Sequence, residues 1–360
     1  MPRTTSKVLV AATLAAVLTS CALDTAGATP DDVSSPLHPC ASARTGPPPA
    51  APSSFPVARS VAPSDLSTSV LQKVDGDPQI HCGRVELTTH TDIVYSSPGS
   101  SALALDLQIP ATPGLKPLVV YVPGGGFMQA DKRGALDLRT YVAEAGYAVA
   151  SIRYRTVTDG AHYTDGVADV KSAVRFLRAH AAEYGIDPTR VALWGESAGG
   201  YLVAMTALTN GRPEFDVGDN LDQSSAVGAV IDKFGPSDMA RIGADFDDDT
   251  ATALTSPSFV STQYFTGAPP GAADPMSYVH ADAPPFLFMH GADDRIVSPS
   301  QTLLLHNALR AAGANSTRYV IDGAGHGDLA AVGGNVKSAQ LWSTTGAMQD
   351  LVGFLARAFG

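Results

Sequence analysis

The chain alternates between two hydrophobic patterns from about residue 84 to its end. Short runs rich in aliphatic and β-branched residues predict strands at 84–97, 102–110, 117–122, 147–154, 190–195, 226–234, 286–291 and 317–322. Longer stretches with apolar residues three and four positions apart predict helices at 136–146, 165–185, 198–208, 300–313 and within 340–359. Strands that alternate with helices are typical of a mainly parallel sheet covered on both faces. We therefore expect an α/β fold.

Two parts of this pattern depart from strict alternation. The strands expected at 84–97 and 102–110 are separated only by a short turn containing Pro and Gly, which predicts an antiparallel N-terminal hairpin. A long stretch before the strand at 286–291 has weak periodicity and much Gly, Pro and Asp. Such a segment inside a compact domain is usually functional, and we expect a small lid-like insertion at about 210–280.

The N-terminal part has the organisation of an exported protein. Basic residues precede an apolar run at 8–18, which is shorter than the ~20 residues a membrane-spanning helix needs. Leu-Thr-Ser-Cys at 18–21 resembles the lipobox of bacterial lipoproteins, in which the cysteine is lipidated. We expect a signal peptide over 1–21, a Pro/Ala/Ser-rich tether over 22–79 and the folded domain over 80–360. Cleavage after Ala28 is the alternative.

The expected location follows from this N-terminal part. Lipidation of Cys21 would anchor the protein on the outer face of the bacterial cell membrane, whereas cleavage after Ala28 would release it as a secreted protein. Either cleavage leaves Cys40 and Cys82 in the mature chain. An even number of cysteines in an oxidising compartment predicts a disulfide, here between the N-terminal arm and the domain, with two free thiols as the alternative.

The charge of the chain limits the kinds of partner that it can bind. The chain has 24 Lys and Arg against 35 Asp and Glu, a net charge of −11, and its basic residues are scattered. Nucleic acid and anionic membrane surfaces are excluded as partners on this basis, apart from membrane contact through a lipid anchor. An uncharged or modestly polar small substrate fits better.

One serine motif lies between an expected strand and an expected helix, which is the context that a nucleophilic serine requires. Gly-Glu-Ser-Ala-Gly at 195–199 has G-x-S-x-G spacing, directly after an expected strand and at the start of an expected helix. On this sharp turn the serine hydroxyl is exposed, and the small flanking residues let strand and helix pack closely. Ser197 is therefore the candidate nucleophile. Glu196 is expected to form hydrogen bonds beneath the turn rather than to transfer protons.

A serine nucleophile needs a base, and the base needs an acid to orient it. His326 lies in a glycine-rich loop after an expected strand, and it follows the serine in the chain order that this motif requires. His290, at the end of the expected strand 286–291, is the rival, and packing at the strand end is its simpler role. Asp293 and Asp294 follow the same strand, and spacing alone does not separate them.

These features resemble the α/β-hydrolase fold, in the esterase/lipase branch related to hormone-sensitive lipases and bacterial feruloyl-esterase-like proteins. The resemblance covers residues 90–357 and rests on DVKSAVRFLRAHAAEYGIDPTRVALWGESAGG, GDNLDQSS, FGPSD and PPFLFMHGADDRIVSPSQ. It implies a serine carboxylic-ester hydrolase without metal or organic cofactor, acting on small or short-acyl esters, including feruloyl or acetyl esters linked to polysaccharides. In the family pattern H-G-x-x-D-x-x-V the acid lies four residues after the histidine, which implies Asp294.

The resemblance also gives a role to three consecutive glycines at 124–126. Relatives commonly carry H-G-G-G-[FW] here, and its N–H groups form an oxyanion hole with the N–H after the nucleophile. This implies Gly125, Gly126 and Ala198. Pro123 stands where relatives have histidine, so the fixed φ of proline or neighbouring residues must orient the loop. The weaker candidates, which could line a substrate pocket or pack in the core, are Phe127, Met128 and Tyr201.

Other functions fit parts of the sequence less well. A peptidase or amidase on this fold usually has an extra propeller or peptide-binding domain, for which the folded region leaves no space. A non-catalytic hydrolase-like binding protein is favoured only by Pro123, because candidates for all three triad positions are present. The glycine loop lacks the Gly-Lys-Ser/Thr of a phosphate site. The aspartate-rich segment 245–250 lacks the glycine and distal glutamate of an EF-hand, so no metal site is expected.

Overall fold

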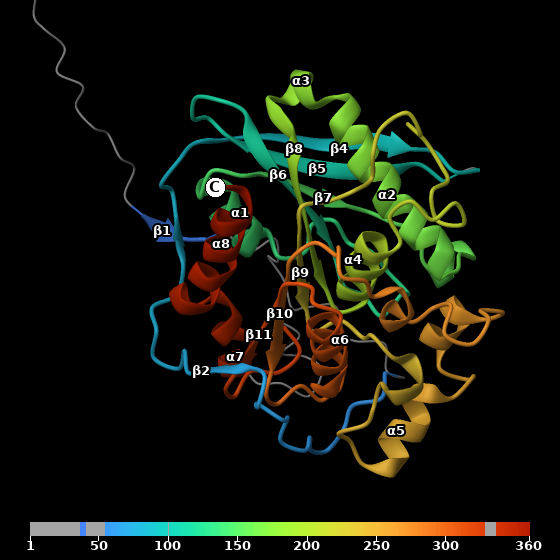
Figure 1. Ribbon diagram of the computed structural model, residues 1–360. Coiled ribbons are helices and arrows are strands. Elements are labelled where there is room, and N and C mark those ends of the chain that lie inside the picture. Colours follow the sequence, from blue (N-terminus) through green and yellow to red (C-terminus); the bar gives the residue numbers. More distant parts are fainter. Residues whose placement is uncertain (1–36, 41–54, 100, 328–335) are drawn as a thin grey trace, which may run out of the picture. The chain divides into compact units, whose positions relative to one another are not determined.

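A nine-stranded sheet forms the centre of the domain in the computed structural model, which describes residues 37–40, 55–99, 101–327 and 336–360 (Figure 1). The strand order is β2-β11-β10-β9-β8-β6-β7-β5-β4. In chain order, these strands are β2 (Val70–Gln72), β4 (Leu87–Ser96), β5 (Leu103–Pro110), β6 (Lys116–Val122), β7 (Ala148–Ile152), β8 (Ile186–Glu196), β9 (Ala229–Lys233), β10 (Phe286–Gly291) and β11 (Ser316–Ile321).

The pairing is parallel over most of this sheet. All pairs from β2 through β11, β10, β9, β8 and β6 to β7 are parallel, whereas β5 runs antiparallel to both β4 and β7. The hairpin β4–β5 is the antiparallel N-terminal hairpin predicted from the sequence. A parallel sheet with this strand order and an antiparallel edge is an α/β-hydrolase sheet, so the predicted fold class is confirmed.

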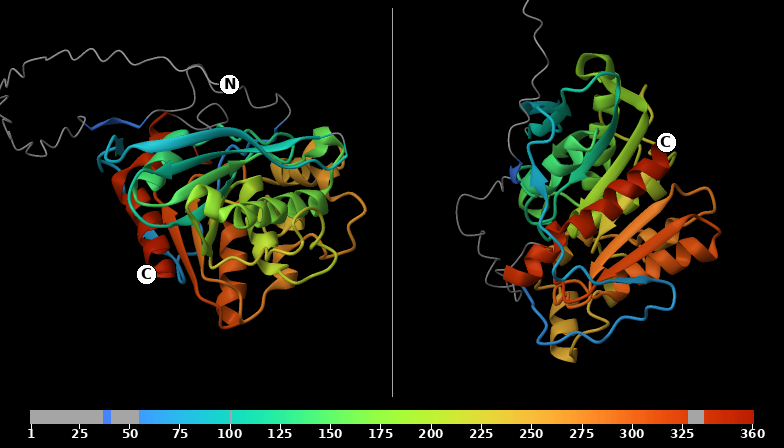
Figure 2. Two further views of the ribbon diagram at one scale, coloured as in Figure 1. Left: turned by 90° about the horizontal axis from the view of Figure 1, so that it is seen from above. Right: turned by 90° about the vertical axis from the view of Figure 1, so that its left-hand side faces the viewer.

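Helices cover both faces of the sheet (Figures 1 and 2). One face packs against α2 (Tyr163–Ala179), α4 (Ala198–Leu208) and α6 (Ser300–Ala311), and the other against α1 (Leu136–Glu144) and α8 (Thr345–Phe359). The remaining helices are short: α3 (Ala181–Tyr184), α5 (Asp248–Thr255), α7 (Val336–Gln340), and the 3₁₀ helices η1 (Val157–Asp159), η2 (Met239–Arg241), η3 (Val260–Phe265), η4 (Pro275–Tyr278) and η5 (Leu341–Ser343). None of the described helices is long and apolar enough to cross a membrane.

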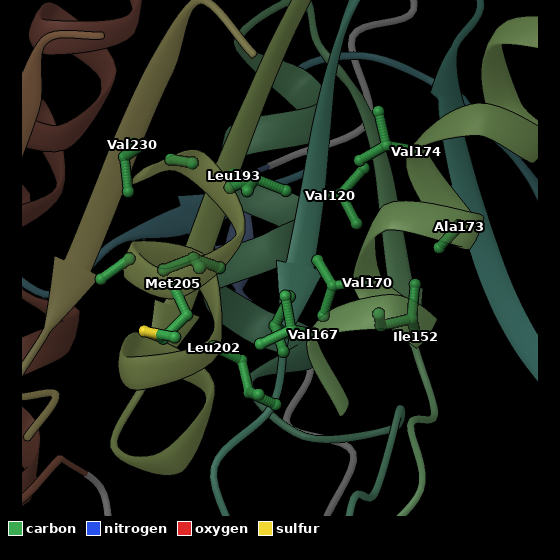
Figure 3. Packing of buried hydrophobic residues seen from close by; sticks show 14 of the residues in the cluster. Val120, Ile152, Val167, Val170, Ala173, Val174, Leu193, Leu202, Met205 and Val230 are labelled. Carbon is green, nitrogen blue, oxygen red and sulfur yellow. The ribbon is translucent and has the colours of Figure 1, made fainter. Parts of the chain in front are cut away.

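The alternation of side chains along β6 shows how the sheet divides the core. Leu118, Val120 and Val122 contribute to the cluster with α2 and α4, whereas Val119 and Tyr121 contribute to the cluster with α1 and α8. Figure 3 shows the first cluster, where valines of α2 meet side chains of the central strands and of α4. Strands buried on both faces explain the continuous apolar runs in the sequence. This rigid centre fixes the strand ends that carry the site.

The chain before β4 belongs to the domain further upstream than the sequence predicts. The expected tether boundary at residue 79 is wrong for 55–79, because β2 adds to the sheet beside β11. The buried Arg318 of β11 donates to Ser69 Oγ at 2.8 Å and to Ser64 Oγ at 3.2 Å. A buried guanidinium requires such acceptors, and this segment supplies them. The signal peptide, Cys21 and the rest of the expected tether lie outside the described residues, apart from 37–40.

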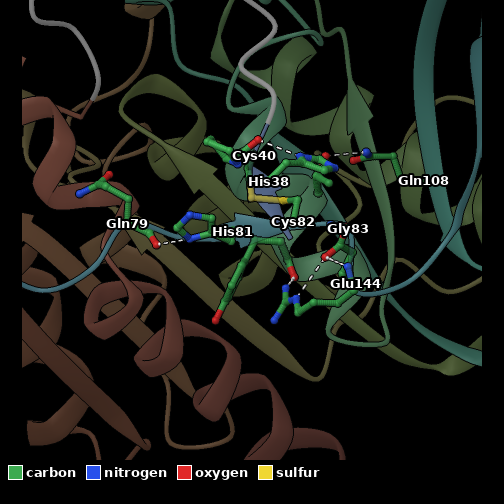
Figure 4. Close-up of a disulfide and its surroundings, with 12 residues drawn as sticks. His38, Cys40, Gln79, His81, Cys82, Gly83, Gln108 and Glu144 are labelled. Atoms are coloured by element: carbon green, nitrogen blue, oxygen red, sulfur yellow. Dashed lines mark hydrogen bonds and ion pairs between the residues drawn. A yellow bond between two sulfur atoms is a disulfide. The ribbon is translucent and has the colours of Figure 1, made fainter. Parts of the chain in front are cut away.

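A disulfide fastens residues 37–40 to the domain (Figure 4). Cys40 and Cys82 are bonded, as the even cysteine pair predicts, and their strands β1 (His38–Pro39) and β3 (His81–Cys82) pair antiparallel. The adjacent Gly83 N–H donates to Glu144 Oε1 of α1 at 2.7 Å. The bridge closes a separation of 42 residues along the chain and fixes the arm beside α1.

The irregular insertion is shorter than expected. The predicted range of about 210–280 includes β9, which lies in the centre of the sheet and cannot be part of an insertion. The irregular part lies between β9 and β10 and contains η2, α5, η3 and η4. The aspartates near α5 have local structural roles. Asp247 caps the helix by accepting from the Thr250 N–H, and Asp245 accepts from the backbone N–H of Ser300 at the start of α6.

Candidate active site

The carboxyl ends of the central parallel strands carry the candidate catalytic residues. Ser197 follows β8, Asp294 follows β10, and His326 follows β11. Because these strands are parallel, their carboxyl ends meet at one edge of the sheet, which is where ligands bind in such folds. Residues far apart in the sequence are thereby brought into direct contact.

Ser197 lies on the strained turn that its motif predicts. Its backbone has φ 55° and ψ −120°, a combination that is costly for any residue with a side chain, and α4 begins at the next residue. A Cβ on Gly195 would lie 2.1 Å from the carbonyl oxygen of Gly199, so the strand and helix can approach this closely only with glycine. The Ser197 N–H donates to the Lys233 carbonyl of β9 at 2.9 Å, which holds the turn against the sheet.

The three predicted triad residues form one continuous hydrogen-bonded chain. His326 Nε2 lies 2.8 Å from Ser197 Oγ, and His326 Nδ1 lies 2.7 Å from Asp294 Oδ2. An ionised carboxylate only accepts hydrogen bonds, so Nδ1 carries the proton and Nε2 is free to accept the serine hydroxyl. This tautomer is the one that a general base next to a serine requires.

The surroundings of Asp294 separate it clearly from Asp293. Asp294 is fully buried, and its Oδ1 accepts from the N–H groups of Ile296 at 2.9 Å and Val297 at 3.0 Å. Burial alone would raise the pKa of this carboxyl, but the electrostatic interaction with His326 and the hydrogen bonds from His290 and His326 hold it well below its ordinary value. The Asp293 side chain is exposed to solvent. The geometry therefore favours Asp294, the residue that the family pattern implies.

His290 occupies a supporting position behind the acid. Its Nε2 lies 3.2 Å from Asp294 Oδ2 and 3.1 Å from the Val297 carbonyl oxygen, and its Nδ1 lies 2.8 Å from Thr302 Oγ1. Both neighbours of Nε2 are acceptors, so Nε2 carries the proton. Burial lowers the pKa of His290, which favours the neutral ring. It therefore packs at the strand end and donates to Asp294, and it is not in contact with Ser197.

The glycine loop after β6 passes directly beside the nucleophile. A Cβ on Gly124 would lie 3.1 Å from the Cβ of Ser197. Among the described residues, no hydrogen bond uses the N–H of Gly125, Gly126 or Ala198, and Ala198 is the first residue of α4. Unpaired N–H groups at a helix N-terminus and in an adjacent loop attract developing negative charge. These are the three donors that the resemblance implies.

Neighbouring side chains hold the loop that contains Pro123. Tyr154 is fully buried, and its hydroxyl donates to the Pro123 carbonyl at 3.0 Å. Ser261 of η3 donates to the Gly126 carbonyl at 2.6 Å. The N–H groups of Met128 and Gln129 both point at the Gly125 carbonyl and close the turn. The loop is thus held without an imidazole, and neither Tyr154 nor Ser261 had a sequence signal that marked this role.

Of the three weaker candidates for pocket residues, two lie in the hydrophobic core and one lies near the glycine loop. Phe127 and Tyr201 are buried in an aromatic cluster, with ring centroids 5.5 Å apart, and they pack in the core rather than line a pocket. Met128 is half-buried, and its ε-methyl group lies 3.3 Å from where a Cβ of Gly126 would be. Phe55, which the sequence reasoning placed in the tether, lies 3.0 Å from the same point. Phe55 therefore belongs to the surroundings of the candidate oxyanion loop.

The chain matches the model of the BD-FAE family over residues 105–309, which is more than half of its length. The chain belongs to the BD-FAE family. The matched region contains Ser197, Asp294 and the glycine loop, whereas His326 lies beyond it. Among the described residues of this family member, no group of three or more His, Cys, Asp or Glu side chains is arranged to hold a metal ion.

Two curated relatives and one solved structure support the same fold. The probable carboxylic ester hydrolase LipM of Mycobacterium tuberculosis is 32% identical over 194 residues, which cover 52% of this chain and 43% of LipM. Esterase LipQ of the same organism is 32% identical over 236 residues, covering 64% of this chain and 54% of LipQ. The chain thus spans about half the length of these relatives. The truncated form of a carbohydrate esterase from gut microbiota has a TM-score of 0.61 and 26% identity, covering 76% of this chain and 97% of that one.

Proposed function

We propose that the protein is a serine carboxylic-ester hydrolase that works through an acyl-enzyme. The observation that carries this proposal is the hydrogen-bonded chain from Ser197 through His326 to Asp294, at 2.8 Å and 2.7 Å. Membership of the BD-FAE family and the names of the relatives support it. A buried ionised acid, a correctly protonated imidazole and a serine on a strained turn are the parts that acyl transfer needs.

Each step of the proposed reaction uses one of these groups. Ser197 Oγ attacks the ester carbonyl while His326 Nε2 takes its proton, and Asp294 stabilises the imidazolium that forms. The N–H groups of Gly125, Gly126 and Ala198 donate to the oxyanion of the tetrahedral intermediate. His326 then protonates the leaving alcohol, which leaves an acyl group on Ser197. Water, deprotonated by the same imidazole, hydrolyses this acyl-enzyme and regenerates the serine.

A labelling experiment tests the proposal directly. The wild-type protein should react with a fluorophosphonate probe at Ser197, as identified by mass spectrometry, and should hydrolyse p-nitrophenyl acetate. Ser197→Ala should do neither while retaining the wild-type far-UV circular dichroism spectrum. A folded wild-type protein that neither labels nor hydrolyses any activated ester would instead support a non-catalytic binding protein.

The substrates we propose are small or short-acyl esters, including feruloyl or acetyl esters on polysaccharides. Apolar side chains crowd the approach to Gly126. The Phe55 ring lies edge-on to Phe259, with centroids 5.0 Å apart, and also packs beside Ile296 and Val297 of the acid loop. The carbohydrate esterase among the structural neighbours supports the polysaccharide-linked class. A panel of p-nitrophenyl esters, methyl ferulate and acetylated xylan distinguishes these substrates.

Phe55→Ala should widen the acyl range. Removing the ring opens space beside Gly126, and each added buried methylene of a substrate can contribute about 0.8 kcal/mol. We expect the ratio of kcat/KM for p-nitrophenyl octanoate to that for the acetate to rise about tenfold, a difference of about 1.4 kcal/mol. Phe246→Ala is the matched control, because Phe246 packs against the same small cluster as Phe55 but is not one of the three side chains nearest to a Cβ at Gly126. An unchanged ratio in Phe55→Ala would reject Phe55 as a wall of the site.

We further propose that the protein is exported and lipid-anchored through Cys21 on the outer face of the bacterial membrane. The Leu-Thr-Ser-Cys sequence at 18–21 supports this location. In a bacterial host, labelled palmitate should enter the wild-type protein and should not enter Cys21→Ser. Equal labelling of both, or of neither, would favour cleavage after Ala28 or another site.

A further inference from the structure

A buried lysine lies directly beneath the nucleophile turn and has no part in the reaction described above. Lys233 ends β9 and is the register partner of Glu196, which ends β8. The side chain of Lys233 is only 2% exposed, and its Nζ lies 2.7 Å from Glu196 Oε1. The other carboxylate oxygen of Glu196 accepts from the Tyr121 hydroxyl of β6 at 3.0 Å. Glu196 therefore connects three neighbouring strands at their carboxyl ends.

The same lysine also holds the serine backbone. The Lys233 carbonyl oxygen accepts the Ser197 N–H at 2.9 Å, which continues the pairing of β8 and β9 one residue past the strands. Ser197 has φ 55°, and a residue in such a conformation stays there only where its surroundings fix it. Lys233 fixes the turn twice, through its backbone to Ser197 and through its side chain to Glu196.

Aromatic rings enclose the ammonium group and extend to the catalytic histidine. Lys233 Nζ lies 4.7 Å from the ring centre of Trp342, 5.6 Å from Phe234 and 5.7 Å from Trp194. A cation is attracted to the faces of such rings, most strongly where water is excluded. Trp342 Nε1 in turn donates to the Gly325 carbonyl at 3.1 Å, and the Phe234 ring lies 4.6 Å from the His326 ring.

Among the described residues, Glu196 is the one carboxylate that forms an ion pair with Lys233. The neighbouring Asp232 points to the opposite face of β9, where its Oδ1 accepts from the Gly235 N–H at 2.8 Å and lies against Gly200 of α4. Loss of the Glu196 charge would leave the buried Lys233 ammonium without a carboxylate partner, whereas loss of the Lys233 charge would leave Glu196 with the Tyr121 hydroxyl and the electrostatic influence of Arg139. In either case the turn would relax.

We propose that Lys233 and Glu196 are positioning residues that hold Ser197 Oγ in line with His326. The ion pair fixes the turn that carries the serine, and its aromatic cage contacts the loop that carries the histidine. The pair touches no substrate and transfers no proton. This inference rests on the proposed hydrolase function, and it predicts which step is lost when the pair is removed.

Lys233→Met tests the inference, because methionine keeps most of the side-chain volume and removes the charge. A small displacement of the nucleophile can cost about 10²-fold in rate. We expect kcat per active site to fall by about that factor, with KM within about threefold of the wild-type value. The rate constant for fluorophosphonate labelling should fall in parallel. Lys233→Arg, which keeps the charge, should lie between Lys233→Met and the wild type.

Lys171 provides a matched control in another part of the domain. Its side chain on α2 is fully buried, and its Nζ lies 2.7 Å from Asp216 Oδ1, as Lys233 lies from Glu196. Lys171→Met removes a buried cation and leaves the half-buried Asp216 without this partner, so it should lower Tm while kcat per active site stays within about twofold. If Lys233→Met does not fold, Glu196→Gln supplies the same test from the partner residue, with an expected kcat loss of about tenfold.

The outcomes separate this inference from the proposed function. A wild-type protein without labelling or hydrolysis would reject the proposed function. An active wild type together with Lys233→Met or Glu196→Gln variants of unchanged kcat would reject the positioning role alone. Equal kcat losses in Lys171→Met and Lys233→Met would also reject it, because the effect would then come from general destabilisation.

Discussion

Asp294→Asn should lower kcat by about 10⁴-fold, whereas Asp293→Asn should leave it within about threefold. Every polar neighbour of the Asp294 carboxylate is a hydrogen-bond donor: the N–H groups of Ile296 and Val297 at Oδ1, and the rings of His326 and His290 at Oδ2. An asparagine has only one acceptor oxygen, so it cannot satisfy both sides.

The loss of one acceptor oxygen affects the hydrogen bond to His326. If its oxygen keeps the two backbone N–H groups, its amide NH₂ group faces His326 Nδ1. That nitrogen must then lose its proton and accept, which places the ring proton on Nε2, 2.8 Å from Ser197 Oγ. An Nε2–H cannot accept the serine proton. The loss of about 10⁴ corresponds to about 5.5 kcal/mol of barrier.

The measurement is steady-state kinetics with p-nitrophenyl acetate, corrected for active sites by fluorophosphonate titration. Asp293→Asn is the matched control, because it makes the same chemical change one residue earlier on an exposed side chain. The pKa of Asp294 lies well below its ordinary value, so the acid limb of the wild-type kcat/KM profile should not reflect protonation of this carboxyl. Equal losses in the two variants, or a larger loss in Asp293→Asn, would show that the acid is misassigned.

The sequence was sufficient to predict the helices and strands whose hydrophobic residues recur with a clear period. All strands from β4 to β11 and the helices α1, α2, α4, α6 and α8 lie where the hydrophobic pattern predicts them. β2 was missed because three residues, Val70–Gln72, are too few to show alternation. Its place in the sheet depends on pairing with β11, more than two hundred residues later in the chain, and local pattern carries no information about such contacts.

The sequence predicts those residues of the candidate site whose chemistry requires a fixed position in a motif. Ser197 and His326 follow from spacing and chain order, and the family pattern selects Asp294 over Asp293. Lys233, Tyr154 and Phe55 act through contacts across the fold, so no motif marked them. Phe127 and Tyr201 show what a motif cannot predict. An aromatic residue next to a motif has the same sequence pattern whether its side chain faces a pocket or packs in the core.

Gly125→Ala should reduce kcat by about 10²–10³-fold, which is the cost of losing one oxyanion donor, about 3–4 kcal/mol. Gly125 has φ 148°, a conformation that suits glycine, and a Cβ there would lie 2.1 Å from the Gln129 carbonyl oxygen. The obstructing atom belongs to the backbone, so it cannot rotate away as a side chain can. The turn is also closed, because the N–H groups of Met128 and Gln129 donate to the Gly125 carbonyl. The loop must therefore open, and its N–H donors must move away from Ser197.

Gly126→Ala is the matched comparison, and we expect it to cost only about tenfold in kcat, about 1.4 kcal/mol. The left-handed φ of 60° adds strain here as well, but the nearest atoms to a new Cβ belong to the side chains of Phe55, Met128 and Ser261, at 3.0, 3.3 and 3.5 Å. Side chains can rotate away where a closed turn cannot. Both variants should still label at Ser197, with Gly125→Ala the slower. A larger loss in Gly126→Ala would place the essential donor at Gly126, and wild-type rates in both would show that the glycine loop does not receive the oxyanion.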